Sequence, residues 1–351
     1  MQGGNAMYRF ALVGCGRISK NHIESLKQLE EQGKAKLVAC CDIIPERAKA
    51  AAEKTNSKAF TSYEDLLKEK DIDIVSICTP SGMHPRHTIM AAQAGKHVLS
   101  EKPAGTKLSE VDAAIDACDE AGIRYFVVKQ NRFNKTVQLL KKAIDENRFG
   151  RIYILLSNVL WTRPQDYYNQ APWRGAWEFD GGCLCNQAAH YVDLMQWMGG
   201  AVESVQAFSA TLARRIEAED TIVVNLRYRS GALGSINVTT LTYPKNLEGS
   251  ITVLGEKGTV RIGGIALNRI DAWEFDQPHP MDEEVEQANT NPTSVYGFGH
   301  LDFYSHVIEA LKGNTNGIVE GREGRKTVEI IQAAYQSALS GGQVKPCAMP
   351  R

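Results

Sequence analysis

The stretch YRFALVGCGRIS, residues 8–19, decides the fold class. An apolar run ends in Gly14-Cys15-Gly16, and Ser19 then stands where dinucleotide-binding turns carry a third glycine or an alanine. The first two glycines allow a tight turn and let backbone N–H groups approach a pyrophosphate at a helix N-terminus. The third place needs only a small residue. We therefore expect a strand, a turn and a helix that bind a dinucleotide through Gly14, Gly16, Arg17 and Ile18.

Further strand-like and helix-like segments alternate after this turn. The apolar runs KLVACCD, IDIVSIC, HVLS and RYFVV lie between amphipathic segments that begin near Ser19, Pro45, Pro85 and Ser109. Strands that are apolar throughout and separated by helices indicate a parallel sheet covered on both faces. We predict an α/β architecture that begins with a Rossmann-type doubly wound domain at residues 7–130.

The pattern changes after Gly150. Longer, alternating strands are predicted in 151–161, 221–241 and 250–264, with hairpins at Ser230-Gly231 and at 255–258. These indicate a C-terminal α+β domain at 131–342 with a mainly antiparallel sheet. One helix is expected over 184–198, and two more at about 301–312 and 325–339 are expected to pack back on the body of the fold. Residues 344–351 are expected to form a loose tail.

Length, charge and cysteine content limit the function classes. The chain of 351 residues favours two domains, and its net charge of -1 gives no reason to expect nucleic acid or a membrane as partner. The first ten residues lack the regions of a signal peptide, and eight cysteines form no C-x-x-C pair, so a cytoplasmic location is expected. His84 and His87 are followed by no further ligand cluster. No metal site is expected.

The cofactor site should lie at the carboxyl ends of the parallel strands. Asp42 ends the second strand, about where a carboxylate would hold the adenosine ribose and repel a 2′-phosphate, which favours NAD over NADP. Asp42 can instead be a simple helix cap, and Arg47 leaves the choice of cofactor open. Three later segments should reach the same edge, and they supply the other expected cofactor contacts: Thr79, Pro80, Ser81, His84, Glu101, Lys102 and Gln130.

Four motifs together resemble a known family. These are the G-x-G turn, a T-P-x-x-x-H loop ending at His84, the E-K-P around Lys102, and G-G-x(4)-Q-x-x-H ending at His190. In this order and spacing they resemble the Gfo/Idh/MocA oxidoreductases over almost the whole chain. The long segments 161–182 and 186–197 look like a narrower group within the family, the UDP-N-acetylglucosaminuronate 3-dehydrogenases, which make precursors of diacetamido-uronic acids for bacterial surface polysaccharides.

The resemblance implies residue roles. His190 matches the family's catalytic histidine, and we expect it to be the base, with Lys102 stabilising the negative charge that develops on the sugar oxygen. The two roles can be exchanged, since burial can lower the pKa of a lysine. Asn186 stands where many relatives have aspartate and is expected to contact substrate. Asp193 lies on the same helix stripe, either functional or simply solvated surface.

A UDP-sugar uronate is the substrate that this resemblance implies. It carries negative charge on its carboxylate and on its pyrophosphate, so cations are expected around it. The expected substrate contacts are Asn186, Arg163, Thr162, Tyr167 and Lys245. Arg174 is also a candidate partner for the substrate's negative charge, but Trp173-Arg174 resembles a family pair near the cofactor, which would place both with NAD instead.

Other functions and the assembly stay open at this point. The chain can oxidise another sugar or cyclitol, use bound NAD to hydrolyse glycosides, or bind NAD as a silent regulator, although Lys102 and His190 argue against the last. The family's sheet packs against neighbouring subunits, which implies a homo-oligomer, either a dimer or a tetramer.

Overall fold

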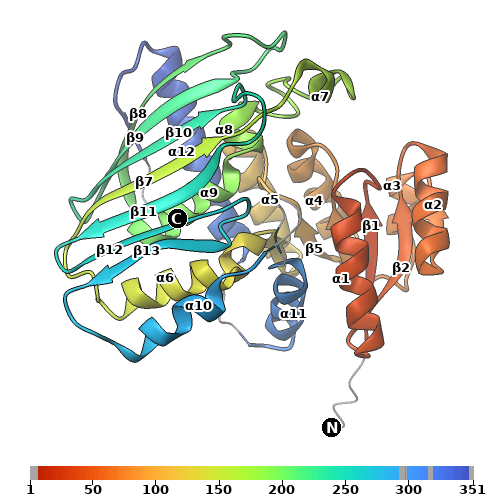
Figure 1. Ribbon diagram of the computed structural model, residues 1–351. Coiled ribbons are helices and arrows are strands. Elements are labelled where there is room, and N and C mark those ends of the chain that lie inside the picture. The colour runs from red at the N-terminus through yellow and green to blue at the C-terminus, as the bar shows by residue number, and fades with distance from the viewer. Residues whose placement is uncertain (1–6, 292–296, 298, 315–318, 348–351) are drawn as a thin grey trace. The chain divides into compact units, whose positions relative to one another are not determined.

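The computed structural model describes residues 7–291, 297, 299–314 and 319–347. The chain forms two compact units, Met1–Val128 with His300–Arg325, and Lys129–Gly299 with Lys326–Arg351 (Figure 1). A segment near the end of the chain is therefore part of the first unit. The sequence-based division used a single boundary at residue 130, and it expected the helix at about 301–312 to pack back on the body of the fold without assigning it to the first unit.

The first unit contains a six-stranded parallel sheet in the order β3-β2-β1-β4-β5-β6. Its strands are β1 Tyr8–Val13, β2 Ala35–Cys41, β3 Lys58–Phe60, β4 Ile74–Ile77, β5 His97–Ser100 and β6 Tyr125–Val127. Its helices are α1 Ser19–Glu31, α2 Pro45–Thr55, α3 Tyr63–Leu67, α4 His84–Gln93 and α5 Leu108–Glu120. This is the expected doubly wound fold, with the order reversing between β1 and β4. The short β3 and α3 were not predicted.

Helix α11, Gly299–Leu311, supplies side chains to the core of the first unit. The ring of Tyr304 packs edge-on against Phe10 of β1, with ring centroids 5.5 Å apart. After α11 the chain returns to β6, where the Val127 N–H donates to the carbonyl of Val319 at 2.8 Å. Tyr304 and Phe10 are fully buried, so α11 completes the core that β1 begins.

The second unit contains an eight-stranded sheet in the order β13-β12-β11-β7-β10-β9-β8-β14. Its strands are β7 Ile152–Leu160, β8 Val202–Ala210, β9 Thr221–Tyr228, β10 Leu233–Thr239, β11 Glu248–Gly255, β12 Gly258–Gly263, β13 Arg269–Phe275 and β14 Lys345–Pro346. Every neighbouring pair is antiparallel except β7 and β10, which run parallel. Both predicted hairpins are confirmed. Strands β8 and β13 were not predicted.

The end of the described chain is not a loose tail. Lys345 pairs with Val205 and Pro346 with Ser204, and the Cys347 N–H donates to the carbonyl of Glu203 at 3.0 Å. The expected tail is therefore wrong for 345–347, because these residues satisfy an edge of β8. Residues 348–351 lie outside the described chain.

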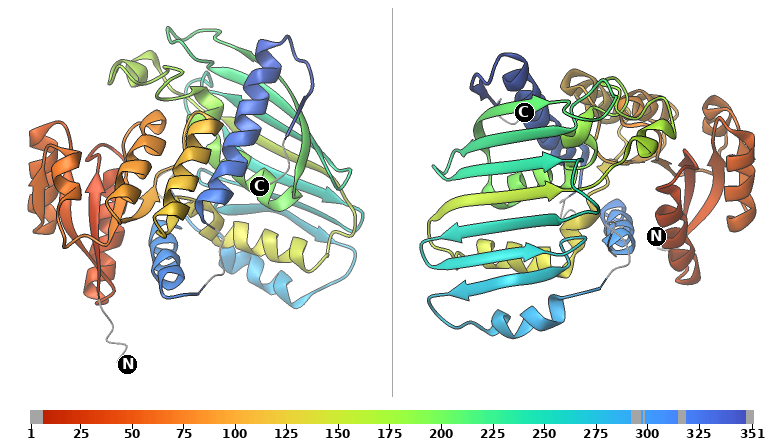
Figure 2. Two further views of the ribbon diagram at one scale, coloured as in Figure 1. Left: turned by 180° about the vertical axis from the view of Figure 1, so that it is seen from behind. Right: turned by 45° about the horizontal axis from the view of Figure 1, so that its top comes forward.

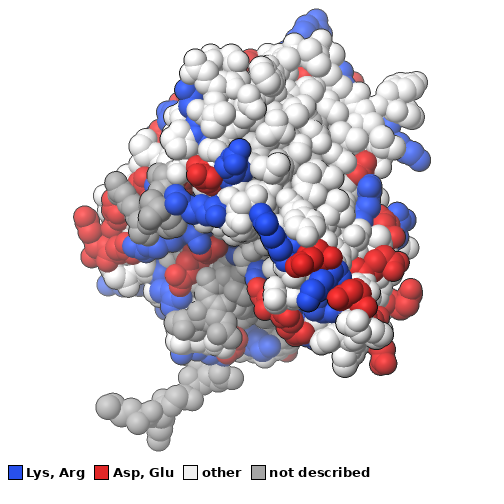
Figure 3. Space-filling model, turned by 90° about the vertical axis from the view of Figure 1, so that its left-hand side faces the viewer, with Lys and Arg blue, Asp and Glu red and all other residues white. Residues whose placement is uncertain are grey.

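Helices cover one face of this sheet, and the other face is open (Figure 2). The covering helices include α6 Lys135–Asp145, α9 Ala189–Gly199 and α12 Gly321–Leu339, while α7 Gln165–Asn169 and α10 Val285–Ala288 lie in loops. Strand β9 alternates accordingly: Val224 and Leu226 are buried, whereas Val223 is exposed. Phe208 and Leu233 are exposed on neighbouring strands. Figure 3 views the molecule from the sheet's side and shows a broad area with few charged side chains.

The predicted helix over 184–198 is two helices, α8 Gly182–Asn186 and α9 Ala189–Gly199. The N–H groups of Gln187 and Ala188 both donate to the carbonyl of Cys183 at 3.0 Å, which closes α8 and lets α9 begin afresh. The prediction of one continuous helix was wrong, because α8 and α9 both bury apolar residues at helical spacing and this spacing does not show the break between them. As a consequence, His190 lies in the first turn of α9, at the end of the helix that carries the positive end of its dipole.

Candidate active site

The glycine turn fits a pyrophosphate. Gly14 has φ +93°, and a Cβ there would lie 2.6 Å from the carbonyl oxygen of Cys78. A Cβ on Gly16 would meet nothing within 4 Å, so this backbone faces open space. The Ser19 hydroxyl donates to the Gly16 carbonyl at 2.6 Å, which explains why serine suits the third place. No side chain caps α1 at Ile18 and no acidic residue stands in its first turn, which leaves N–H groups for an anion.

Asp42 braces this turn. One carboxylate oxygen accepts from the Cys15 N–H at 2.8 Å and the other from the Ile44 N–H at 2.9 Å, just before α2. Helix α2 has Ile44 as its N-cap residue and no side-chain capping bond, so Asp42 is not the simple helix cap considered above; its carboxylate holds the glycine turn and the residue before α2. Further lone pairs remain on its oxygens. Its contact with a ribose stays a prediction, while Arg17 is exposed beside it.

His84 joins two of the segments expected at the cofactor. Its ring nitrogens lie 2.8 Å from the carbonyl oxygens of Thr79 and of Pro103, and the side chain is buried. Thr79 and Pro80 are half-buried, and Ser81 is buried at the start of a short 3-10 helix. His84 therefore fixes the loop after β4 to the turn after β5, and we propose that it serves the cofactor by placing these loops.

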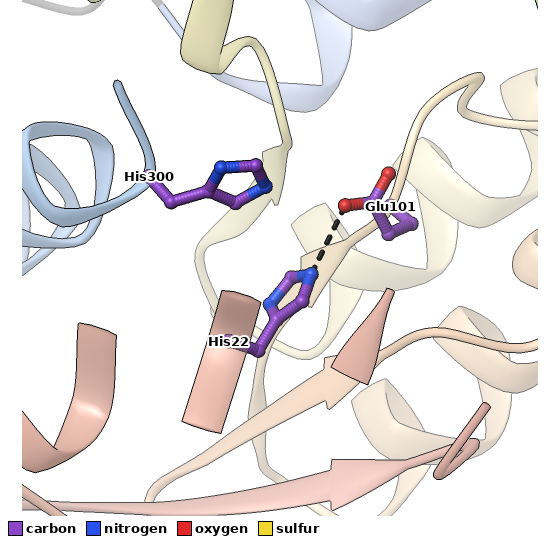
Figure 4. Close-up of side chains that lie close together, drawn as sticks. All are labelled: His22, Glu101 and His300. Atoms are coloured by element: carbon purple, nitrogen blue, oxygen red, sulfur yellow. Dashed lines mark hydrogen bonds and ion pairs between the residues drawn. The ribbon is translucent and has the colours of Figure 1, made fainter. Parts of the chain in front are cut away.

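Glu101 and Lys102 form the turn after β5. Glu101 is buried and Lys102 is half-buried. Two histidines far away in the sequence, His22 on α1 and His300 on α11, lie beside the Glu101 carboxylate (Figure 4). Sequence reasoning missed both, because neither histidine belongs to a recognisable motif.

In the second unit, His190 contacts Gln130. Gln130 begins a 3-10 helix, Gln130–Phe133, and its amide nitrogen lies 3.0 Å from Nε2 of His190. Among the described residues its amide oxygen has no hydrogen-bond partner, although it is buried. An amide nitrogen facing Nε2 donates to it and leaves the ring proton on Nδ1, whereas the reversed amide accepts from Nε2. The orientation of the Gln130 amide is thus coupled to which nitrogen of His190 carries the proton.

A buried ion cluster holds Gln130 in place. Asp193 accepts hydrogen bonds from Lys129 Nζ, and from Arg132 at 2.8 Å and 2.7 Å. Burial alone would raise the pKa of Asp193, but Arg132 and Lys129 hold that pKa well below its usual range. The reading of Asp193 as solvated surface was wrong, because both partners lie far away in the sequence. Asp193 ties the segment with Gln130 to the helix with His190.

Several expected ligand residues gather around Tyr167; we name them the arginine–tyrosine cluster. The guanidinium of Arg174 lies 4.2 Å from the Tyr167 ring centroid and 4.7 Å from that of Trp173, and the guanidinium of Arg163 lies 5.5 Å from Tyr167. The Thr162 hydroxyl and Nε of Arg174 are buried without a hydrogen-bond partner among the described residues. Such unused polar atoms beside two cations suit an anionic ligand.

Two further expected substrate residues are Asn186 and Lys245. The Asn186 side chain donates to Asp180, whose other oxygen accepts from the Gly175 N–H at 2.7 Å. Asp180 was not foreseen, and it orients Asn186. Lys245 is exposed on the loop between β10 and β11, next to Asn246, which accepts from the Thr162 N–H at 2.8 Å.

Two solved structures of similar proteins contain NADH and a sugar nucleotide. In the solved structure of the WlbA dehydrogenase from Bordetella pertussis in complex with NADH and UDP-GlcNAcA, the protein is 55% identical to this chain, with 98% of each chain covered and a TM-score of 0.94. The WlbA dehydrogenase from Chromobacterium violaceum, also with NADH and UDP-GlcNAcA, is 52% identical over 99% of this chain and 97% of its own, with a TM-score of 0.93.

More distant relatives act on other polyols. Myo-inositol 2-dehydrogenase from Thermotoga maritima is 30% identical over 96% of this chain and 98% of its own length. Residues 8–129 match the model of an oxidoreductase family's NAD-binding Rossmann fold, and residues 141–345 match the C-terminal α/β domain of the same family. The chain therefore belongs to the Gfo/Idh/MocA family of oxidoreductases, whose first domain binds NAD.

Proposed function

We propose that this chain oxidises the 3-hydroxyl of UDP-N-acetylglucosaminuronic acid to the 3-keto sugar, with NAD as the hydride acceptor. The product would enter the biosynthesis of a diacetamido-uronic acid for surface polysaccharide. The observation that carries this proposal is the high identity, over almost the full length, to two dehydrogenases solved with NADH and this sugar nucleotide.

The chemistry requires a proton acceptor and a donor for the reacting oxygen. NAD accepts the hydride when it is bound. We assign proton removal to His190, because its position at the start of α9 favours the neutral imidazole that can accept a proton. We assign Lys102 to the sugar oxygen, where an ammonium stabilises developing negative charge.

The arginine–tyrosine cluster suits the anionic parts of the substrate. Guanidinium groups bind carboxylate and phosphate in a forked geometry, and Arg163 and Arg174 both stack near Tyr167. We propose that Arg163, with Thr162, Tyr167, Asn186 and Lys245, binds the sugar nucleotide. Arg174 and Trp173 are assigned to the cofactor together with Gln130.

The open sheet face is the proposed contact between copies of this chain. Exposed apolar side chains on it include Phe208, Val223 and Leu233, which a partner subunit would remove from water. We propose a homo-oligomer, either a dimer or a tetramer, built through this face. We also propose a cytoplasmic location, in keeping with eight free cysteines. None of the described helices is long and apolar enough to cross a bilayer.

The deciding experiment is absorbance at 340 nm after mixing the protein with NAD and UDP-N-acetylglucosaminuronic acid at enzyme concentrations that reveal one turnover. We expect a rise for this sugar and none for myo-inositol, and we expect Lys102→Met and His190→Asn to abolish the rise while NAD binding persists. A rise with myo-inositol alone would assign the chain to cyclitol oxidation. Glycoside cleavage without NADH would assign it to NAD-assisted hydrolysis.

A further inference from the structure

A chain of buried hydrogen bonds crosses the core of the first unit. It begins at Ser76 on β4, whose hydroxyl lies 3.0 Å from the hydroxyl of Tyr304 on α11. Tyr304 lies 2.7 Å from Nδ1 of His22 on α1, and Nε2 of His22 lies 3.0 Å from one carboxylate oxygen of Glu101. Ser76, Tyr304 and His22 have no exposed surface. The contacts are complete whether His22 carries one proton or two, because both hydroxyls can rotate.

This series of hydrogen bonds ends at the backbone of Lys102. The second carboxylate oxygen of Glu101 accepts the Lys102 N–H at 3.0 Å. Burial by itself would raise the pKa of Glu101, but the hydrogen bond and attraction of His22, followed by Lys102, hold that pKa below its usual range. Glu101 therefore stays a carboxylate at working pH and acts only as an acceptor. A buried carboxylate without such a partner would cost several kcal/mol.

His300 lies beside this series of hydrogen bonds and adds no charge to it. Its ring lies edge-on to His22, with centroids 5.7 Å apart, and burial, followed by repulsion from His22, lowers the pKa of His300 to about 4. Two histidines and a carboxylate are also a ligand set for a divalent metal. Here, however, His22 and Glu101 hydrogen-bond each other directly (Figure 4), so their pairing needs no ion.

We propose that His22 is a positioning residue for Lys102. His22 fixes the position of the Glu101 carboxylate, and this carboxylate in turn accepts the Lys102 N–H. The backbone of Lys102 is therefore held in place, and only its side chain moves during the reaction. This inference rests on the role of Lys102 in the proposed function. Loss of His22 would let the carboxylate rotate or take up a proton, and either change releases the backbone of Lys102.

The first test compares His22→Leu with His22→Gln, whose amide can still donate to Glu101. We expect His22→Leu to lower kcat by about 10 to 100-fold with KM for the sugar nucleotide and the Kd for NAD within about two-fold, because small misplacements of a reacting group cost this much. His22→Gln should recover most of the rate. His97→Gln is the control: His97 lies on β5, the strand that precedes Glu101, and accepts the Arg124 N–H at 2.9 Å, and this variant should leave kcat unchanged.

A second readout does not depend on substrate. Competitive labelling of lysine amines, read by peptide mass spectrometry across pH, should show a several-fold change at Lys102 in His22→Leu and none at Lys58. Changed labelling with unchanged turnover would support the positioning role and refute the catalytic assignment of Lys102. Unchanged labelling and turnover would overturn the proposal.

Two further outcomes are informative. If His22→Leu does not fold, Glu101→Met removes the acceptor of the Lys102 N–H at similar side-chain volume, and normal kcat in that variant would overturn the proposal. Metal content of the purified protein tests the other use of these residues. One equivalent of zinc that His22→Gln loses would make the cluster a metal site and would equally overturn it.

Discussion

Glu219 is expected to make the stability of the second unit depend on pH. It is buried, and one of its carboxylate oxygens accepts the Leu184 N–H at 2.9 Å and lies 2.9 Å from the Tyr335 hydroxyl. The same hydroxyl donates to the carbonyl of Gly181. One hydroxyl proton cannot serve both acceptors, and a protonated Glu219 supplies the second. Burial correspondingly raises the pKa of Glu219 to about 7.

The size of the effect follows from linkage. The usual pKa of 4.5 applies to the unfolded chain, so between pH 4.5 and about 7 the folded protein binds one proton more. Its stability is therefore full below pH 4.5 and is lost as the pH rises through about 7. At about 1.36 kcal/mol per pH unit, the total loss is about 3 kcal/mol.

The assay is urea unfolding of wild type, Glu219→Gln and Glu217→Gln from pH 5 to pH 9. Glu217 is the matched control, because it is exposed and accepts only the Trp177 N–H, at 3.0 Å. Relative to wild type, Glu219→Gln should gain about 2.5 kcal/mol between pH 5 and pH 9, because part of the loss in wild type has already occurred at pH 5, and the control should gain less than about 0.5 kcal/mol. A constant difference across this range would show that Glu219 is ionised throughout and would refute the reasoning.

Three further results are expected. Asp193→Asn leaves two buried cations without their anion and should lower the free energy of unfolding by about 3 to 5 kcal/mol in urea at pH 7; an unchanged midpoint would contradict the ion cluster. Gln130→Glu places a carboxylate beside His190, so the acidic limb of the kcat/KM profile should move up by about one pH unit or more, whereas an unmoved limb would exclude His190 as the titrating group. Phe208→Glu should reduce the mass measured by light scattering, and an unchanged mass would exclude the open sheet face as the subunit contact.

The sequence predicted those parts of the fold that depend on residues close together in the chain. The glycine turn at Gly14 and the apolar parallel strands can each be recognised within about a dozen residues, because turn geometry and the spacing of buried side chains depend on sequence neighbours. The break between α8 and α9 was missed, since the apolar spacing on either side matches one continuous helix. Two hydrogen bonds, from the N–H groups of Gln187 and Ala188 to the carbonyl of Cys183, interrupt the helix, and the spacing of apolar residues does not reveal them.

The candidate site could be predicted from the sequence where its residues stand in motifs. It could not be predicted where a residue's environment depends on partners far away in the sequence. Lys102 and His190 stand in motifs, whereas the environment of each depends on residues far away. His22 and Glu101 are 79 positions apart, and Asp193 and Arg132 are 61 apart. The charge state of a buried carboxylate depends on such partners. The sequence alone therefore allowed Asp193 to be interpreted as solvated surface, because it does not show that Arg132 and Lys129 surround this residue.

The return of α11 to the first unit has a consequence for synthesis on the ribosome. Tyr304 and His300 complete the interior that Phe10, His22 and Ser76 begin, yet they are translated only after residues 129–299, the larger part of the second unit. At about 5 to 20 residues per second, the nascent Rossmann sheet must wait on the order of 10 to 30 s for its last helix. During that interval its unfilled interior is a natural client surface for chaperones, and a protein truncated before α11 should keep that surface permanently.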